Sequence, residues 1–265
     1  MIRVVVSGAK GRMGSCVVDA VSAAQDMQVV GCYAPLNAGE AVTCADGTLT
    51  CSGDLAGLLN ETHADVMVDF TQPDVAAENV ACALSHGVHV VLGTTGVAPE
   101  RLAEIQRQSS RGGARLFYAP NFTTGAVLMM QFAKMAAKYF PDAEIIEMHH
   151  DGKKDAPSGT ALQTARLMGE ARGHVRNAGP GPETETPGHE GARGCEEDGI
   201  RIHAVRGAGF MASQEVVLSS LGQTLTIRHD STQRESYMPG VLLAVRSVAD
   251  LPDGFTVGLE RIMGL

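Results

Sequence analysis

The chain has 265 residues, 44% of them hydrophobic and 19% charged, a composition typical of a folded globular protein with one large or two smaller domains. Its formal net charge of −9 argues against a surface that coats nucleic acid, because that function needs a basic face. No apolar run approaches the roughly 18 residues of a membrane span, so we expect no membrane partner.

The six cysteines are scattered, without a C-x-x-C pair and without a neighbouring histidine cluster. This distribution argues against a zinc site or a disulfide scaffold. The chain opens on the strand-like run IRVVVSG and not on a charged and then apolar leader. We therefore expect reduced thiols, a cytoplasmic location and no bound metal.

The first part of the chain alternates short β-branched runs with helical stretches, which is typical of βαβ units that feed a parallel sheet. Strands are expected over residues 2–9, 27–34, 64–71, 89–95 and 114–120. Helices are expected over residues 11–24, 75–87 and 99–111. The alternation predicts an α/β fold with a Rossmann-like, doubly wound parallel sheet.

The pattern changes beyond Asn121. Helices are expected over residues 125–140 and 158–173, with an alternating segment over 143–150 between them. Residues 177–199 are polar and rich in Gly and Pro, and we expect a mobile loop there. Strands of antiparallel character are then expected over 200–206, 212–220 and 223–231. A last helix, over 239–251, is expected to pack back on the first domain.

The segment SGAKGRMG places Gly8, Gly11 and Gly14 between the first strand and its helix. Small residues let the backbone approach a pyrophosphate, whose charge is stabilised by free N–H groups and by the positive end of the helix. The position of the segment favours a dinucleotide-binding loop over a plain tight turn.

The choice of dinucleotide is open. An acidic residue about twenty positions beyond the glycines would bind a ribose 2′-hydroxyl, but the second strand ends at Ala34 and Pro35. Lys10 and Arg12 could reach a 2′-phosphate, or they are solvated loop cations. NADPH is slightly favoured, with use of NADH also expected.

Two further turns follow strands, DFTQP at residues 69–73 and GTTG at residues 93–96. Ligands of open α/β sheets bind beyond the carboxyl ends of the strands, where both turns fall. Phe70 of the first turn and Gly93, Thr94 and Thr95 of the second are candidate cofactor contacts. The alternative is that both are ordinary strand-to-helix turns.

The run EMHHDGKKDAPSGT gathers two histidines and two lysines in an otherwise bland region. Glu147 and His149 share one face of the expected strand, and His150 lies on the other, so adjacent histidines cannot both reach one metal. Lys153 and Lys154 would also repel a cation. The run is too polar for a core histidine, and an anion site fits it better.

His149, His150 and Lys153 precede a helix that starts near Ser158, whose first N–H groups are unpaired. A substrate carboxylate there would offset the unfavourable placement of a lysine at a helix N-terminus, and a dicarboxylate could be held by both ends. Ser158 or Thr160 can also be a simple helix cap. The pKa of histidine, about 6.5 in model peptides, allows it to donate a proton near neutrality.

Together with APNF and RHDSTQRESYMPGVLLAVR, these motifs closely resemble the 4-hydroxy-tetrahydrodipicolinate reductase (dihydrodipicolinate reductase) family of bacterial lysine and diaminopimelate biosynthesis. The resemblance runs nearly end to end. It implies NAD(P)H-dependent reduction of a dicarboxylate and a homotetramer. It also implies a dinucleotide-binding domain over residues 1–120, completed by 238–265, and a substrate-binding and tetramerisation domain over 121–237 with an open mixed sheet.

By position, the resemblance implies that His149 is the proton donor and Lys153 its charged partner. The groups implied to hold the dicarboxylate are His150, Lys153, Ser158, Gly159 and Thr160. The implied cofactor contacts are Gly8, Gly11, Arg12, Met13, Gly93, Thr95, Ala119, Asn121 and Phe122. Arg234 and Tyr237 match positions near the cofactor or a closing hinge.

Two alternatives share the glycine loop. A Rossmann-fold dehydrogenase of an amino-acid semialdehyde would need a nucleophilic cysteine in a defined motif, and none of the six cysteines stands in one. A non-catalytic NAD(P)H-binding protein would not need His149 together with Lys153.

Overall fold

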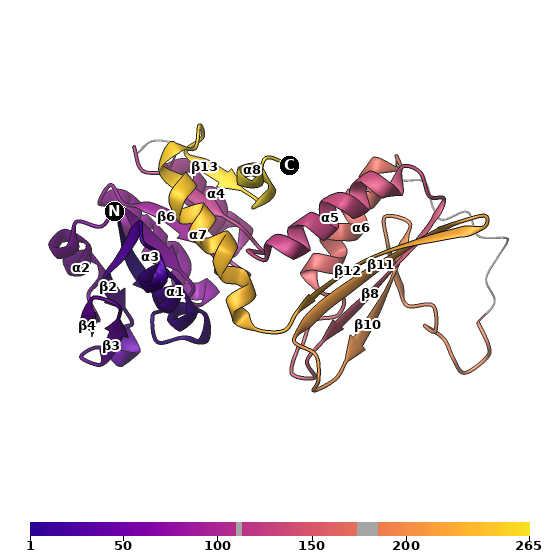
Figure 1. Ribbon diagram of the computed structural model, residues 1–265, viewed down its shortest axis with the longest axis horizontal. Coiled ribbons are helices and arrows are strands. Elements are labelled where there is room, and N and C mark those ends of the chain that lie inside the picture. The colour runs from indigo at the N-terminus through magenta and orange to yellow at the C-terminus, as the bar shows by residue number, and fades with distance from the viewer. Residues whose placement is uncertain (110–112, 174–184) are drawn as a thin grey trace. The chain divides into compact units, whose positions relative to one another are not determined.

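The computed structural model describes residues 1–109, 113–173 and 185–265. They form two compact units, each with its own sheet (Figure 1). Unit 1 comprises Met1–Thr124 and Tyr237–Leu265, and unit 2 comprises Gly125–Ser236. None of the helices in the described ranges combines the length and the apolarity that crossing a bilayer would need.

Unit 1 is built on an eight-stranded sheet with the order β13-β7-β6-β5-β1-β2-β4-β3. Its strands are β1 (Ile2–Ser7), β2 (Met27–Tyr33), β3 (Ala41–Cys44), β4 (Gly47–Ser52), β5 (Val66–Asp69), β6 (His89–Leu92), β7 (Leu116–Tyr118) and β13 (Phe255–Val257). Neighbouring strands run parallel except β3, which is antiparallel to β4. The order grows outward from β1 in both directions, so the predicted doubly wound sheet is confirmed.

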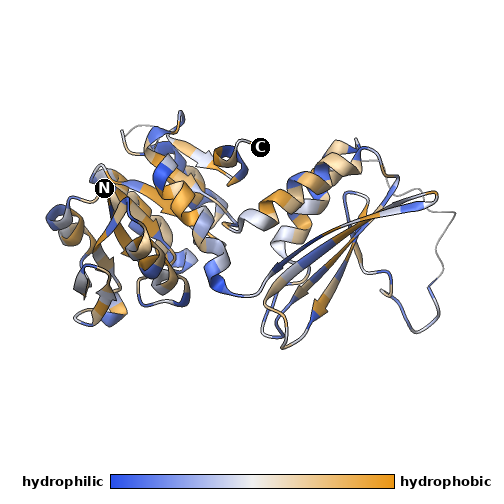
Figure 2. Cartoon of the chain, in the orientation of Figure 1, coloured by the Kyte–Doolittle hydropathy of each residue, from blue (hydrophilic) through white to orange (hydrophobic). Residues whose placement is uncertain are grey.

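Helices cover both faces of this sheet (Figure 1). They are α1 (Arg12–Ala23), α2 (Leu55–Thr62), α3 (Pro73–Ser85), α4 (Pro99–Ser109) and α7 (Met238–Ser247), with the short α8 (Glu260–Met263), η1 (Pro35–Asn37) and η3 (Val248–Asp250). Val5, Met67 and Val90 pack in one core with residues of α2, α3 and α4. Val4 and Val6 are fully buried on the other face, where α1 contacts α7. Figure 2 shows hydrophobic residues concentrated in this sheet and its covering helices.

The β3–β4 hairpin, α2 and β13 were not predicted. β3 has four residues and β13 has three, which is too short for a periodic signal. The helix α2 begins after Asp54, whose carboxylate accepts a hydrogen bond from the Gly57 N–H at 3.1 Å. This cap was the available signal for α2.

Unit 2 contains a five-stranded sheet with the order β12-β11-β8-β10-β9. Its strands are β8 (Asp142–His149), β9 (Cys195–Glu197), β10 (Ile200–Arg206), β11 (Ala212–Ser220) and β12 (Gln223–Ser231). β10 runs parallel to β8, whereas β11 is antiparallel to β8 and to β12. The sheet is therefore mixed, as expected. The antiparallel character expected for β10 holds for its pairing with β9 but not for its pairing with β8. The helix between β8 and β10 supplies the crossover that a parallel pair needs.

Two helices, α5 (Thr124–Ala137) and α6 (Gly159–Ala171), contribute to one core on one face of the sheet. Ala133 and Ala165 of these helices pack there with Ile145 of β8 and Val216 of β11. Side chains alternate along a strand, so Glu144 and Ile146 belong to the opposite face.

The expected loop over residues 177–199 falls partly outside the described residues, because 174–184 are not described. The remainder contains β9, which pairs with β10 in antiparallel orientation. The loop prediction is wrong for these three residues, since their pairing comes from a neighbouring strand and not from their own composition.

Candidate active site

The glycine loop of unit 1 is a close-packed turn between β1 and α1. A Cβ atom on Gly14 would lie 1.9 Å from the Gly8 carbonyl oxygen, and one on Gly8, whose φ is +84°, would lie 2.4 Å from the Phe70 carbonyl oxygen. Only glycine fits these two positions. Within the described chain no side chain caps α1 at Gly11, so the first N–H groups of α1 are available to an anion. The loop therefore fits a pyrophosphate.

A buried carboxylate ties together the strand ends beside this loop. Asp69 is fully buried at the end of β5 and accepts five hydrogen bonds. The shortest come from Ser7 Oγ and Thr94 Oγ1, both at 2.7 Å, and from Thr71 Oγ1 at 2.8 Å. Asn79 Nδ2 of α3 donates at 3.0 Å. Asp69 thus joins the ends of β1, β5 and β6, and sequence reasoning missed it.

The predicted contacts in the two strand-end turns meet in space. A Cβ atom on Gly93 would lie 2.2 Å from the ring of Phe70, and the rings of Phe70 and Phe122 have centroids 5.8 Å apart. Phe122 and Ala119 are 1% exposed, so their side chains belong to the core. Asn121 Oδ1 accepts a hydrogen bond from the Thr123 backbone N–H at 2.8 Å.

The remaining predicted cofactor contacts are exposed or partly exposed: Lys10, Arg12, Met13, Thr95 and Arg234. Lys10 is paired, with its Nζ 3.1 Å from Glu40 Oε2 and donating to the Ala41 carbonyl oxygen at 3.1 Å. Arg234 lies in η2 (Arg234–Tyr237).

The candidate substrate site of unit 2 is organised around Glu147, whose side chain is 0% exposed. Arg206 donates to both carboxylate oxygens, from Nη1 and Nη2, at 2.9 Å each. His149 Nδ1 lies 2.6 Å from Oε2, and the Ser158 N–H donates to Oε1 at 3.1 Å. Burial would raise the pKa of Glu147, but the hydrogen bonds from Arg206 and His149 outweigh it and hold that pKa below its ordinary value.

This arrangement fixes the state of His149. An ionised carboxylate can only accept, so the Nδ1 atom of His149 carries a proton. Among the described residues no hydrogen bond engages its Nε2 atom. Burial, and to a smaller extent the nearby cations Lys153 and Arg206, lower the pKa of His149, although Glu147 opposes them. The imidazole is therefore mostly neutral near pH 7, with Nε2 as its free nitrogen.

Lys153 does not stand free beside the helix. Its Nζ donates to both carboxylate oxygens of Asp155 at 2.8 Å, and the ion pair with Lys153 lowers the pKa of Asp155. The Asp155 carbonyl oxygen accepts from Arg206 Nη2 at 2.8 Å. Arg206 thus joins the segment before α6 to β10, and neither Arg206 nor Asp155 was predicted.

Ser158 is the N-cap of α6, because its Oγ accepts a hydrogen bond from the Ala161 N–H at 3.2 Å. The interpretation of Ser158 as a helix cap is therefore confirmed. Ser158 is 3% exposed, whereas Gly159 is exposed and a Cβ atom there would meet nothing within 4 Å. Thr160 is partly exposed, and its carbonyl oxygen accepts from Thr164 Oγ1 at 2.7 Å. The first turn of α6 is therefore open to a ligand at Gly159.

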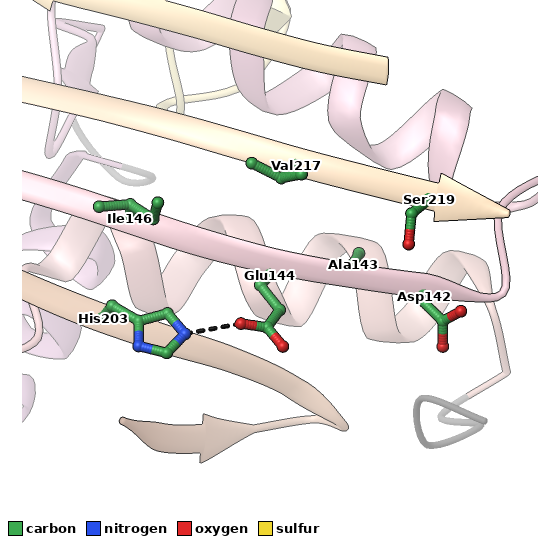
Figure 3. Close-up of a pocket in the computed structure, with 7 residues that line it drawn as sticks. All are labelled: Asp142, Ala143, Glu144, Ile146, His203, Val217 and Ser219. Carbon is green, nitrogen blue, oxygen red and sulfur yellow. Dashed lines mark hydrogen bonds and ion pairs between the residues drawn. The ribbon is translucent and has the colours of Figure 1, made fainter. Parts of the chain in front are cut away.

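A separate hollow of about 440 Å³ lies on unit 2, lined by Asp142, Ala143, Glu144, Ile146, His203, Val217 and Ser219 (Figure 3). His203 Nε2 lies 2.7 Å from Glu144 Oε2. Glu144 and Ile146 alternate along β8 with Glu147 and His149, so the hollow and the His149 site belong to opposite faces of the sheet. Its acidic residues would also repel a dicarboxylate, and we do not assign the substrate to it.

A Rossmann-type unit with a glycine loop that fits a pyrophosphate, joined to a second unit with a His–Glu–Arg cluster at a helix N-terminus, is typical of a nucleotide-dependent oxidoreductase. The chain matches two family descriptions, "Dihydrodipicolinate reductase, N-terminus" over residues 2–122 and "Dihydrodipicolinate reductase, C-terminus" over residues 125–263. It belongs to the dihydrodipicolinate reductase family, and the resemblance seen in the motifs is confirmed. Its cofactor is a pyridine nucleotide.

Individual relatives agree with this assignment. The 4-hydroxy-tetrahydrodipicolinate reductases of Thermobifida fusca and Mycolicibacterium smegmatis are 50% and 46% identical, over 100% of this chain and 100% of theirs. A solved structure, dipicolinate-bound dihydrodipicolinate reductase from Paenisporosarcina sp. TG-14, has a TM-score of 0.87 and 37% identity, and the match covers 99% of each chain.

Proposed function

We propose that this chain reduces 4-hydroxy-tetrahydrodipicolinate to tetrahydrodipicolinate in lysine and diaminopimelate biosynthesis, with His149 as the proton donor. The observation that carries the proposal is the buried Glu147, which holds His149 in one tautomer next to the open first turn of α6. The names of the relatives and the dipicolinate bound by the solved relative support this choice of substrate.

Unit 1 binds the cofactor in this proposal. Bound NADPH or NADH supplies the hydride. The glycine loop, with Gly8, Gly11 and Gly14, and the first N–H groups of α1, on Arg12 and Met13, hold the pyrophosphate. The strand-end residues at the carboxyl edge of the sheet contact the nicotinamide half, and these are Phe70, Gly93, Thr94, Thr95 and Asn121, with Ala119 and Phe122 contributing through their backbone because their side chains are buried. Arg234 is a further contact. We favour NADPH, with NADH also used, because no acidic residue stands at the end of β2.

Unit 2 holds the dicarboxylate. One carboxylate occupies the N-terminus of α6 at Gly159 and Thr160, and Ser158 fixes the turn there. Lys153 and His150 bind the other carboxylate. In the structure Lys153 pairs with Asp155, whose side chain is 64% exposed. Breaking an exposed ion pair costs little free energy, so a substrate carboxylate can replace Asp155 beside Lys153.

The substrate itself prepares His149 for acid catalysis. A lowered pKa keeps the free imidazole neutral, but a doubly negative ligand beside it favours the charged form and raises that pKa. His149 then binds a proton at Nε2 and delivers it as the hydride arrives, while Glu147 stabilises the imidazolium. The 4-hydroxyl leaves with one ring hydrogen as water, and the hydride that a bound reduced nicotinamide would supply and the proton from His149 enter the ring in their place. A positioned acid contributes roughly 10²- to 10⁴-fold in rate.

The proposal includes a homotetramer in the cytoplasm. The sheet face of unit 2 opposite α5 and α6 carries the hollow of Figure 3, with Ile146 and Val217 beside charged groups, and a second copy would cover it. Six free cysteines suit a reducing compartment. Sedimentation of the purified chain tests the assembly, and Val217→Glu is expected to split it.

The activity test uses substrate generated in place by its synthase, with NADPH or NADH added, and follows loss of the reduced-nicotinamide absorbance. Rapid loss is expected with the dicarboxylate and none with an amino-acid semialdehyde offered in parallel. Nucleotide binding without turnover on either compound would point to a non-catalytic binding protein. Turnover of the semialdehyde alone would point to the other dehydrogenase class.

A further inference from the structure

The pair formed by Lys10 and Glu40 lies beside the glycine loop and is used by no step described so far. We propose that Glu40 determines the choice between NADH and NADPH: it accepts from the ribose hydroxyls of NADH, and it competes with the 2′-phosphate of NADPH for Lys10. This inference rests on the proposed function, because it assumes that the loop binds a pyridine nucleotide.

Backbone contacts place Glu40 beside β4, one strand away from the carboxyl end of β2, where other Rossmann folds place their ribose-binding acid. The Gly8 N–H donates to the carbonyl oxygen of Tyr33, the last residue of β2, at 2.8 Å, which joins the glycine loop to that strand end. The Cys51 N–H donates to the Glu40 carbonyl oxygen at 2.8 Å, which folds the segment after η1 back on β4, the neighbour of β2. Ala34, at the usual position of the acid, is 6% exposed and cannot bind a hydroxyl through its side chain.

Two side chains hold the Glu40 carboxylate in this place. Asn37 Nδ2 donates to Oε1 at 2.8 Å, and Lys10 Nζ lies 3.1 Å from Oε2. The hydrogen bonds from Asn37 and Lys10 lower the pKa of Glu40, so it is ionised at neutral pH. A carboxylate with two oxygens keeps acceptor capacity beyond these two contacts. Glu40 can therefore accept a ribose hydroxyl without releasing Lys10.

The 2′-phosphate of NADPH meets the same pair differently. It carries negative charge, so it is repelled by Glu40 and attracted by Lys10. The side chains of Lys10 and Glu40 are 31% and 51% exposed, and an exposed pair of this kind is weak enough to be exchanged. A phosphate can thus take Lys10 from Glu40, whereas NADH leaves the pair intact. One ion pair then lets both nucleotides bind and sets the ratio of the affinities for NADPH and NADH.

The test is direct titration of NADPH and NADH into the purified full-length chain, with Glu40→Gln as the main variant. Loss of the charge frees Lys10, and we expect NADPH to bind about fivefold tighter and NADH about threefold weaker, the range of an exposed charge contact. Glu40→Asp should restore most of the native ratio. Asp26→Asn is the matched control, because Asp26 pairs with Arg246 at 2.7 Å and precedes β2, at the opposite edge of the sheet from the glycine loop. It should leave the ratio unchanged.

Lys10→Gln tests the other half of the pair. It should weaken NADPH about tenfold and change NADH less than about twofold. In the double variant Lys10→Gln/Glu40→Gln the gain in NADPH affinity should be much smaller than in Glu40→Gln alone, since the cation that the phosphate would take is gone. High salt should reduce all of these differences.

The outcomes separate the two hypotheses. If the native chain binds neither nucleotide, the proposed function fails and the role of Glu40 fails with it. If both nucleotides bind but Glu40→Gln leaves their ratio within twofold of native, only the inference about Glu40 is overturned. It is also overturned if Glu40→Gln and Asp26→Asn weaken both nucleotides equally, which would indicate a general loss of structure.

Discussion

In the described parts of the chain each unit buries a carboxylate near the end of a strand, and the two carboxylates have opposite surroundings. Asp69 in unit 1 is surrounded by neutral donors, namely hydroxyls, an amide and a backbone N–H. Glu147 in unit 2 is surrounded mainly by titratable or charged side chains, His149 and Arg206. Neutral donors give a fixed scaffold, whereas a histidine partner gives a site whose proton content can change. The comparison separates an acid that holds loops from one that prepares chemistry.

Replacing Glu147 is the strongest way to test this comparison. Glu147→Gln leaves Arg206 without its counterion and removes the acceptor that fixes the His149 tautomer. We expect kcat to fall at least about 10²-fold and the free energy of unfolding to fall by about 3 kcal/mol, the cost of breaking a buried pair. Steady-state kinetics and urea denaturation measure the two effects.

Glu144→Gln is the matched control for Glu147→Gln, because Glu144 also pairs with a histidine, His203, but on the other face of β8. It should change kcat less than about twofold and stability by less than about 1 kcal/mol. Equal effects of the two substitutions on kcat would mean that Glu147 has no special part in the reaction.

Removing the acid itself should affect rate more than binding. In His149→Gln we expect kcat to fall by about 10²- to 10⁴-fold with KM for the dicarboxylate within a few-fold of native. In Lys153→Ala, loss of a charge that contacts the substrate should raise KM about tenfold and lower kcat as well. Equal, mild losses in the two variants would show that their roles are wrongly assigned.

Asp69→Asn should give a different pattern from Glu147→Gln. An amide would oppose one of the donors around Asp69, loosening the turns at the ends of β1, β5 and β6, at a cost of about 1–3 kcal/mol. We expect the Kd of the nucleotide to rise about tenfold, while dicarboxylate binding and the pH dependence of kcat stay as in the native chain. A shift of the pH profile in Asp69→Asn would remove the distinction between the two carboxylates.

Much of this arrangement could be predicted from local sequence. β10, β11 and β12 have the predicted bounds because alternation of apolar and polar residues is a short-range signal. The same alternation placed Glu147 and His149 on one face, and their hydrogen bond confirms it. The helix near Ser158 was also predicted from the local sequence, and the cap was one of the two interpretations of Ser158.

The partners of both buried acids could not be predicted, because they come from distant parts of the chain. Arg206 reaches Glu147 only since β10 pairs with β8 in parallel, with Arg206 opposite His149, across 59 residues from Glu147. Ser7 reaches Asp69 across 62 residues through the pairing of β1 with β5. The sequence of one strand does not show which other strand pairs with it. The sequence around Glu147 or Asp69 therefore predicts neither Arg206 nor Ser7 as a partner.

The smallest expected effect is on the pH dependence of stability, where His149 and Glu147 act in different pH ranges. Burial lowers the pKa of His149 below its ordinary value of about 6.5, so the unfolded chain binds that proton more readily than the folded chain. Stability should therefore fall as pH drops below about 6.5, by at most about 1.4 kcal/mol per pH unit for each such histidine. The lowered pKa of Glu147 adds a further loss of stability that begins only below the ordinary glutamate pKa of about 4.5. His149→Gln should reduce the slope between pH 6.5 and 5 without abolishing it, because burial also lowers the pKa of His89 and His229. Urea denaturation at a series of pH values measures the slope, and an unchanged slope in His149→Gln would mean that this imidazole titrates alike in the folded and unfolded chain.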